Sequence, residues 1–225
     1  MRTAAALPQA SPISAGPGPH LRSAHARDPD VRGRGGVPGG PGIVAAATGV
    51  AACMSIPTPT TPAPDLDVPL VGGGQFRLAD QRPDAFTLVV FYRGLHCPIC
   101  RGYLAELNRS LDDFAAIGVT SVVAVSGDDA DRAQQSVTDW GLDRLQVGYG
   151  QSVESMRAWG LFVSKGIADS EPDLFGEPGV FLIRPDVTVY MAAVNSMPAA
   201  RPRISDVLGA ARFFTENNYP ARGEA

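Results

Sequence analysis

A pair of cysteines directly behind a strongly apolar run constrains the fold of this chain more than any other feature. The run Leu88–Tyr92 has the β-branched and aromatic residues of a buried strand, and Cys97 and Cys100 follow it after a short turn. Pro98 suits the first turn of a helix, because it has no N–H to leave unpaired and its φ is already helical. The sequence therefore predicts a strand that leads through a turn into a helix, with Cys97 at the helix N-terminus.

This position has a chemical consequence for Cys97. The unpaired N–H groups and the dipole of a helix N-terminus favour negative charge, and they lower the pKa of a thiol from about 8.5 towards neutrality. The thiolate is the reactive form of cysteine. Cys100 lies close enough along the helix to close a disulfide with Cys97, so the pair predicts a thiol redox site.

The remaining composition excludes several classes of protein. After Cys53 the chain has 14 basic and 21 acidic side chains and no cluster of Lys and Arg, which gives no reason to expect nucleic-acid binding. No apolar run approaches the roughly 20 residues that a membrane span needs. Three cysteines in 225 residues do not make a disulfide scaffold. A single Cys-x-x-Cys without a second Cys or His pair also argues against structural zinc.

The N-terminal part of the chain differs in composition from the rest. Residues 1–42 are dominated by Ala, Pro, Gly, Ser and Arg, which leaves too little apolar surface to offset the entropy of ordering. We interpret 1–61 as a disordered low-complexity extension and linker, and 62–220 as one domain in a cytoplasmic protein. Two other interpretations stay open. Translation would begin at Met54 in one, and in the other an export signal would end at Cys53 as the lipid anchor of a lipoprotein.

Hydrophobic periodicity predicts alternating strands and helices within the domain. Strands are expected at 66–70, 75–78, 85–92, 119–125, 145–149, 180–183 and 188–193, and helices at about 98–117, 130–140, 152–159 and 205–217. Residues 161–177 are expected to be irregular. Alternation in the first half requires parallel strands with right-handed crossovers, and the last hairpin adds an antiparallel edge. The expected fold class is α/β, with a mixed central sheet flanked by helices and an N-terminal β-hairpin.

Three segments carry a resemblance to a known family. They are Ala63–Leu66, which opens the first hairpin, Phe91–Cys100 around the cysteines, and Pro178–Asp186 at the late hairpin. In this order they resemble the thioredoxin fold and, within it, the peroxiredoxin-like proteins of the alkyl hydroperoxide reductase and thiol-specific antioxidant family. The resemblance extends from about residue 62 to residue 217.

The resemblance implies roles for four residues. Cys97 would be the peroxidatic nucleophile, and Cys100 its resolving partner. Arg93 would stabilise the thiolate and the oxyanion that develops on the peroxide. Pro178 matches the proline of thioredoxins that packs opposite the disulfide, and it would follow a cis peptide bond.

The sequence also departs from the family pattern. Typical peroxiredoxins carry Pro-x-x-x-Thr-x-x-Cys, whereas this chain has Val90 and Gly94 at the proline and threonine positions. The threonine that hydrogen-bonds the peroxide is therefore missing. The arginine that begins the corresponding strand in the family is missing too, because Pro178 stands in its place.

Three functions are compatible with these residues. In the first, Cys97 reduces a hydroperoxide, its sulfenic acid condenses with Cys100, and an external dithiol of the thioredoxin or glutaredoxin type resets the pair. The second is a thioredoxin-like reductase whose substrates are protein disulfides. The third is a metal-binding module through His96, Cys97 and Cys100. For the two enzymes we expect no cofactor, and a homodimer is left open.

Overall fold

The computed structural model describes residues 55–225. Residues 1–54 of the extension and linker predicted over 1–61 lie outside this part of the chain, and so do the interpretations that depend on Cys53 and Met54. The last residues of the predicted linker are included. Thr60 donates its N–H to the carbonyl oxygen of Val189 at 2.7 Å, and Val189 donates its N–H to Thr61 at 2.9 Å. The linker therefore contacts the domain from Thr60 on, just before the boundary expected at residue 62. The domain boundary itself stays a prediction.

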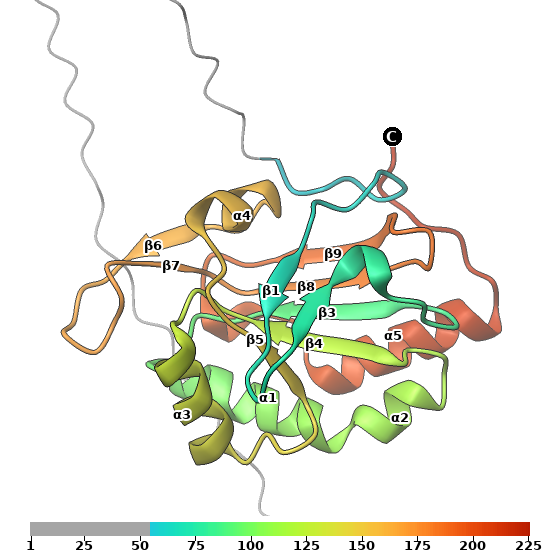
Figure 1. Ribbon diagram of the computed structural model, residues 1–225. Helices are drawn as coiled ribbons and strands as arrows, with labels where there is room; N and C mark the ends of the chain where they lie inside the picture. Colours follow the sequence, from blue (N-terminus) through green and yellow to red (C-terminus); the bar gives the residue numbers. More distant parts are fainter. Residues whose placement is uncertain (1–54) are drawn as a thin grey trace, which may run out of the picture. The chain divides into compact units, whose positions relative to one another are not determined.

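A five-stranded mixed sheet forms the centre of the domain, with strand order β5-β4-β3-β8-β9 (Figure 1). Its strands are β3 (Thr87–Phe91), β4 (Ser121–Val125), β5 (Gln146–Gly148), β8 (Gly179–Ile183) and β9 (Val189–Val194). β3 pairs in parallel with β4 and antiparallel with β8, so Phe91 lies opposite both Val125 and Gly179. The predicted mixed sheet, its parallel first half and its antiparallel last hairpin are confirmed.

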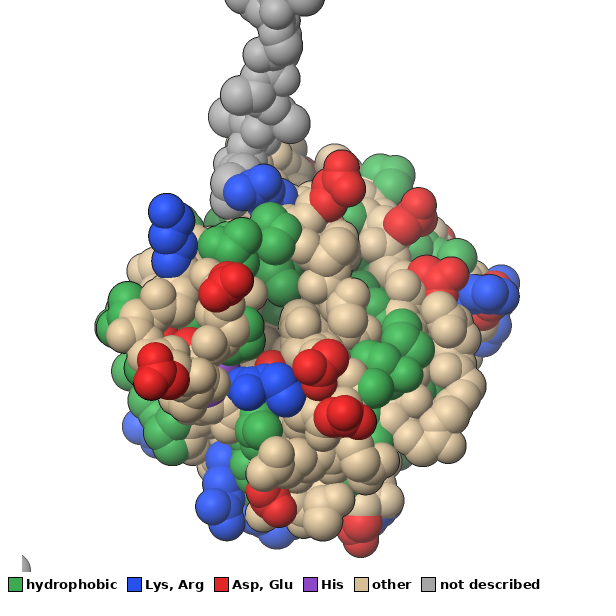
Figure 2. Space-filling view, turned by 60° about the vertical axis from the view of Figure 1, so that its left-hand side comes forward, with side chains coloured by type: hydrophobic (Ala, Val, Ile, Leu, Met, Phe, Trp, Pro, Cys, Tyr) green, Lys and Arg blue, Asp and Glu red, His purple; other side chains and the backbone are tan. Residues whose placement is uncertain are grey.

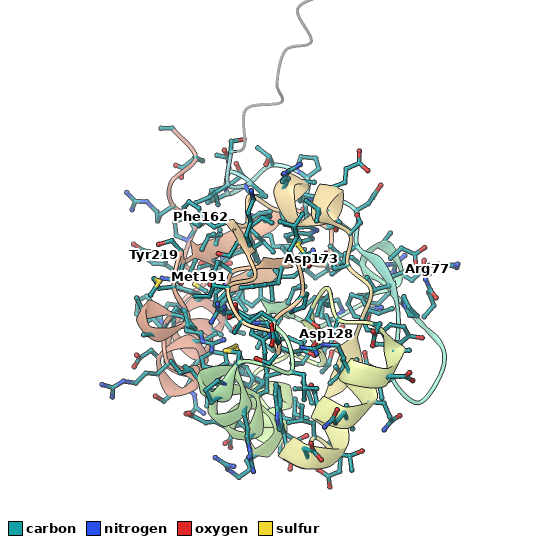
Figure 3. All side chains as sticks on the ribbon, turned by 90° about the vertical axis from the view of Figure 1, so that its left-hand side faces the viewer. Arg77, Asp128, Phe162, Asp173, Met191 and Tyr219 are labelled. Carbon is teal, nitrogen blue, oxygen red and sulfur yellow. A yellow bond between two sulfur atoms is a disulfide. The ribbon has the colours of Figure 1, made fainter. Side chains whose placement is uncertain are left out.

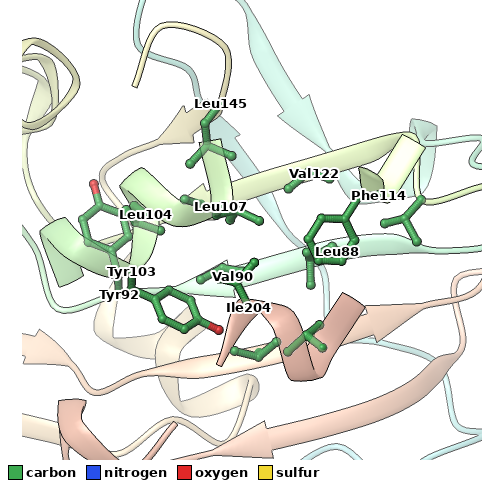
Figure 4. Close-up of a cluster of buried hydrophobic side chains, with 14 of the residues drawn as sticks. Leu88, Val90, Tyr92, Tyr103, Leu104, Leu107, Phe114, Val122, Leu145 and Ile204 are labelled. Atoms are coloured by element: carbon green, nitrogen blue, oxygen red, sulfur yellow. The ribbon is translucent and has the colours of Figure 1, made fainter. Parts of the chain in front are cut away.

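Different elements cover the two faces of this sheet. The helices are α1 (Pro98–Arg109), α2 (Leu111–Ala115), α3 (Ala130–Trp140), α4 (Val153–Ala158) and α5 (Ile204–Glu216). Leu88 and Val90 face the core beneath α1, α2, α3 and α5, as Figure 4 shows, whereas Val89 and Phe91 face the core beneath α4 and the N-terminal hairpin. β3 is therefore buried on both sides, which explains why its sequence is a continuous apolar run.

The N-terminal hairpin consists of β1 (Asp67–Pro69) and β2 (Gln75–Arg77), which pair antiparallel as predicted. Gly72, Gly73 and Gly74 all have positive φ in the connecting turn, a conformation that glycine adopts without steric cost. A short 3-10 helix (Leu78–Asp80) follows β2, and a second one, η2 (Pro198–Ala200), precedes α5.

Two expected elements differ from the structure. Residues 161–177 are not irregular, because β6 (Val163–Lys165) and β7 (Leu174–Gly176) form an antiparallel hairpin. Each strand has only three residues and the polar loop between them is long, so no alternating pattern marks them in the sequence. The expected helix over 98–117 is also divided: Ser110 ends α1 and begins α2, and its hydroxyl donates back to the Glu106 carbonyl at 3.0 Å.

Asn108 connects α1 to the loop that precedes β5. Its side-chain oxygen accepts the N–H groups of Arg144 at 3.1 Å and Leu145 at 2.9 Å. Its amide nitrogen donates to the Gly141 carbonyl at 3.2 Å and to Asp143 at 2.9 Å. The side chain is 7% exposed, so these hydrogen bonds satisfy backbone groups that water does not reach.

Replacement of Asn108 by Ala leaves the buried N–H of Leu145 without an acceptor. We expect Asn108→Ala to lower the free energy of unfolding by about 1–3 kcal/mol, the usual cost of an unpaired buried polar group. Urea denaturation measures this change. Gln134, an exposed residue of α3, hydrogen-bonds only Thr138, and Gln134→Ala should change stability by less than about 0.5 kcal/mol. Equal effects of the two substitutions would contradict this account of Asn108.

Candidate active site

Cys97 lies at the N-cap of α1, as predicted. Its φ of −100° and ψ of 101° place it just outside the helix, and its Sγ accepts a hydrogen bond from the backbone N–H of Cys100 at 3.2 Å. Ser and Asp cap helices with the same contact through oxygen. The positive end of the helix dipole is therefore directed at the Cys97 sulfur.

Cys97 and Cys100 form a disulfide, with their Cα atoms 5.2 Å apart. Their exposed fractions are 1% and 0%, and both belong to the core between the sheet and α1. The predicted disulfide is thus present, and in the oxidised protein it is covered by surrounding side chains.

A tight turn holds Cys97 in this place. The N–H of Cys97 donates to the Gly94 carbonyl at 3.1 Å, which closes the turn between β3 and α1. Gly94 has a φ of +129°, and a Cβ atom there would lie 2.7 Å from both carboxylate oxygens of Asp128. Glycine is therefore required at this position both by the backbone conformation and by the close approach of Asp128.

Asp128, which lies in the loop after β4, anchors the turn between β3 and α1. It lies inside the molecule beside the beginning of α3 (Figure 3), and only 2% of it is exposed. Its carboxylate accepts the N–H of Leu95 at 2.7 Å and pairs with Arg132 at 3.0 Å. Asp128 is not among the site residues expected from the sequence. Its position just after the end of β4 was the available signal, because the carboxyl ends of adjacent parallel strands lie side by side.

Arg93 is engaged by acidic residues of the β6–β7 region. Its guanidinium nitrogens lie 3.5 Å from Glu171 and 3.4 Å from Glu177, and the group lies over the Phe175 ring at 4.6 Å. Among the contacts of the described residues, none joins Arg93 to a cysteine sulfur. Two carboxylates thus already balance its charge, and its role as a thiolate stabiliser stays a prediction.

His96 packs beside the same aromatic ring. Its imidazole lies 4.6 Å from Phe175 between ring centres. Burial, reinforced by the nearby positive charge of Arg93, lowers the pKa of His96 from its ordinary 6.5. The imidazole is therefore neutral at pH 7 and does not supply a positive charge to the Cys97 thiolate.

Pro178 corrects one expectation, because the described residues contain no cis peptide bond. Hydrogen bonds hold the backbone on both sides of the residue in an extended path. The N–H of Glu177 donates to Phe162 at 2.7 Å, and the carbonyl of Pro178 accepts the N–H of Asn195 at 3.0 Å. An extended trans path lets the chain pass from β7 to β8 while both hydrogen bonds are kept.

Arg201 is the residue that sequence analysis missed. It follows η2, it is 8% exposed, and its Nη2 donates to the Sγ of Cys100 at 3.3 Å. Its guanidinium also lies over the ring of Tyr103, a residue of α1, at 4.2 Å. No signal in the sequence joins Arg201 to a cysteine 101 residues earlier.

The metal-binding alternative has no support in the described part of the chain. No three or more side chains of His, Cys, Asp and Glu gather there as metal ligands would. Both sulfurs are committed to the disulfide.

Basic and acidic side chains are interspersed over the face in Figure 2, without a basic patch. None of the described helices has the length and apolarity needed to cross a membrane.

The fold and the site define a thioredoxin-fold protein with a disulfide at the start of a helix. The family model of the AhpC/TSA family matches residues 59–192, more than half of the chain, and the chain belongs to this family. It is accordingly a thiol-dependent oxidoreductase of the peroxidase type, and the predicted resemblance is confirmed. No curated protein matches the sequence significantly.

Solved peroxiredoxin structures share this fold. Peroxidoxin BcpB from Mycobacterium tuberculosis is 15% identical with a TM-score of 0.55, over 72% of this chain and 97% of that one. A mutant of peroxiredoxin 6 from Arenicola marina is 15% identical with a TM-score of 0.60, and the match covers 72% of this chain and 74% of that one. Reduced Prx3 from Vibrio vulnificus in complex with hydrogen peroxide is 14% identical with a TM-score of 0.58, and the match covers 68% of this chain and 97% of that one. At these identities the likeness concerns the fold alone.

Two glycines close to the cysteines provide a matched pair of substitutions. Gly94→Ala forces a left-handed backbone and a collision with Asp128, so it should lower the free energy of unfolding by about 1–3 kcal/mol. Gly102 lies in α1 with open space around its Cα, and Gly102→Ala should raise stability by about 0.5–1 kcal/mol. Chemical denaturation of both variants checks the opposite signs. A neutral Gly94→Ala variant would show that the turn is not tightly held.

The lowered pKa of His96 predicts a pH dependence of stability. Because the unfolded state binds a proton at a higher pH than the folded state, the wild type loses stability as pH falls through 6.5 towards the folded pKa. His96→Gln removes this proton uptake. The stability of the wild type relative to the variant should therefore decrease between about pH 7.5 and about pH 5. A constant difference in unfolding free energy over this range would contradict the burial of the imidazole.

Proposed function

We propose that this protein reduces hydroperoxides with Cys97 as the attacking thiolate and Cys100 as the resolving thiol. The observation that carries the proposal is the contact at the start of α1. The Cys97 sulfur replaces a capping oxygen there, and it already shares a disulfide with Cys100. A sulfur held at the positive end of a helix is ionised more readily than a free thiol.

The proposed cycle has three steps. The Cys97 thiolate attacks the terminal peroxide oxygen, so that an S–O bond forms, the O–O bond breaks and an alkoxide or hydroxide leaves. Cys100 then attacks the resulting sulfenic acid and expels its oxygen as water once protonated. Two thiols of an external dithiol finally reduce the disulfide and restore both cysteines.

Backbone groups are the proposed donors to the leaving oxygen. Pro98 has no N–H, so Ile99 and Cys100 supply those of the first turn of α1. Arg93 is a second candidate, and it would need to exchange part of its contact with Glu171 for the peroxide. Donors of this kind stabilise developing negative charge most effectively where water is excluded.

The family also implies the proposed partners. A peroxide is the substrate class, which agrees with the hydrogen peroxide complex of the structurally similar Prx3 from Vibrio vulnificus. A dithiol of the thioredoxin type is the proposed reductant, and the cytoplasm, where such reductants keep thiols reduced, is the proposed compartment. The homodimer that the sequence leaves open would be checked by the size of the protein in solution.

Reduction of protein disulfides is the second candidate function. It is favoured by Gly94, which stands where typical peroxiredoxins have the threonine that binds peroxide, and by a Cys-x-x-Cys in one helical turn. Thiol–disulfide exchange needs no oxyanion donor, so this pair alone suffices for it. Turbidity of insulin in the presence of dithiothreitol measures this activity.

The two cysteines should respond differently to substitution. Cys97→Ser should abolish peroxide consumption, because it removes the proposed peroxidatic thiolate at the N-cap of α1. Cys100→Ser should still consume one equivalent of peroxide, and dimedone should trap the sulfenic acid on Cys97. Peroxide consumption and mass spectrometry check both results. Wild-type protein that reduces insulin but loses no thiols in peroxide would replace the first function by the second.

A further inference from the structure

Arg201 is a buried cation beside the second sulfur of the active site. Its Nη2 donates to the Cys100 Sγ at 3.3 Å, and its guanidinium stacks on Tyr103 at 4.2 Å. Both contacts are made to α1 from the segment between η2 and α5. Arg201 is thus fixed against the helix that carries the cysteines.

The charge of Arg201 has no carboxylate partner among the described residues. It makes none of the ion pairs in this part of the chain, and its Nε and Nη1 atoms are buried without a hydrogen-bond partner. Glu177 is the carboxylate whose charge acts on Arg201, but it lies 3.4 Å from Arg93 and accepts the Ser164 hydroxyl at 2.7 Å. A buried charge is costly unless it is paired, so the oxidised protein lacks a counter-ion for Arg201.

Reduction of the disulfide supplies that counter-ion. When the S–S bond opens and Cys97 is held in a mixed disulfide, Cys100 is left as a thiolate at the position where Nη2 already donates. Hydrogen bonds to a charged acceptor are about twice as strong as those to a neutral one. Tyr103 on α1 is the other ionisable group in contact with Arg201, and burial raises its pKa to about 12, so it stays protonated and uncharged.

We propose that Arg201 is a catalytic residue that stabilises Cys100 as a thiolate, which makes Cys100 the nucleophile in resolution and the leaving group in reduction. The resolution part rests on the proposed peroxidase function, whereas the stabilisation of the thiolate holds for any thiol chemistry of the pair. The two cysteines are then activated by different means, Cys97 by the helix N-terminus and Cys100 by Arg201.

The two steps that involve Arg201 balance as follows. In resolution the Cys100 thiolate attacks the Cys97 sulfenic sulfur, an S–S bond forms, the S–O bond breaks and hydroxide leaves to take up a proton. In reduction the thiolate of an external dithiol attacks the Cys97 sulfur, the S–S bond breaks and Cys100 leaves as the thiolate beside Arg201. A thiol of lower pKa is the better leaving group, so the reductant is directed to Cys97.

The timing of the two activations follows from their charges. A reduced pair holds its first negative charge on one sulfur, since two adjacent thiolates repel each other. Once Cys97 has become a sulfenic acid it no longer carries that charge. Cys100 then ionises beside Arg201 at the stage when it must attack.

A redox equilibrium tests the proposal without any peroxide. Arg201→Met should shift the equilibrium between the dithiol and the disulfide in glutathione buffers towards the disulfide by about 10- to 100-fold, because the single negative charge that the reduced pair carries loses the buried cation beside it. A tenfold shift corresponds to about 30 mV for this two-electron couple. Arg201→Lys, which keeps the charge, should recover part of the shift.

Arg184 provides the matched control. It lies over the Tyr190 ring at 4.8 Å, directly after the end of β8 that is remote from Gly179 and the cysteines. Arg184→Met removes a similar stacked guanidinium and should leave the glutathione equilibrium unchanged. An equilibrium within threefold of the wild type in folded Arg201→Met would overturn the proposal, as would an equal shift in Arg184→Met.

A second measurement keeps Arg201 itself in place. In the variant Cys53→Ser/Cys97→Ser, Cys100 is the only cysteine, and the ultraviolet absorbance of its thiolate against pH gives its pKa. We expect the midpoint well below the ordinary thiol value of about 8.5. A midpoint at or above that value would overturn the proposal. If Arg201→Met shifts the glutathione equilibrium as expected but the wild type loses no thiols in peroxide, the peroxidase function alone is refuted. The role of Arg201 as a stabiliser of the thiolate then stands.

Discussion

The buried carboxylate of Asp128 is the contact on which the geometry of the site depends. It joins the turn after β3 to the loop after β4, through the Leu95 N–H at 2.7 Å and through Arg132 at 3.0 Å. A carboxylate taken out of water is stable only when such partners surround it. The turn and the beginning of α3 are therefore held to each other, and this turn places Cys97 at the start of α1.

Much of the fold could be predicted because its signals are local. The run before the cysteines marks β3, the spacing of Cys97 and Cys100 marks the disulfide, and Gly118 marks the end of the α1–α2 segment with a φ of +80°. The β6–β7 hairpin escaped prediction since its strands are too short to show alternation. The trans peptide bond before Pro178 was not predicted either. The residues around it hydrogen-bond Phe162 and Asn195, and no local pattern in the sequence reveals these contacts.

The active site was harder to predict than the fold, since several of its charged groups come from segments that are distant in sequence. Arg93 adjoins the cysteine motif in sequence, yet Glu171 and Glu177 balance its charge. Arg201 adjoins nothing recognisable in sequence, yet it contacts a sulfur and has no carboxylate partner among the described residues. A positive residue close to a cysteine in sequence is therefore weaker evidence for thiolate stabilisation than the pairing of its charge in the folded chain.

The long sequence separation between Cys100 and Arg201 also has a consequence during biosynthesis. Ribosomes add about 5–20 residues per second, so Arg201, which follows Cys100 by 101 positions, is added about 5–20 s after it. Until then the nascent chain also lacks β8, which pairs with β3. Under the proposed role of Arg201, Cys100 of the growing polypeptide therefore lacks its cationic partner until nearly the whole chain has emerged.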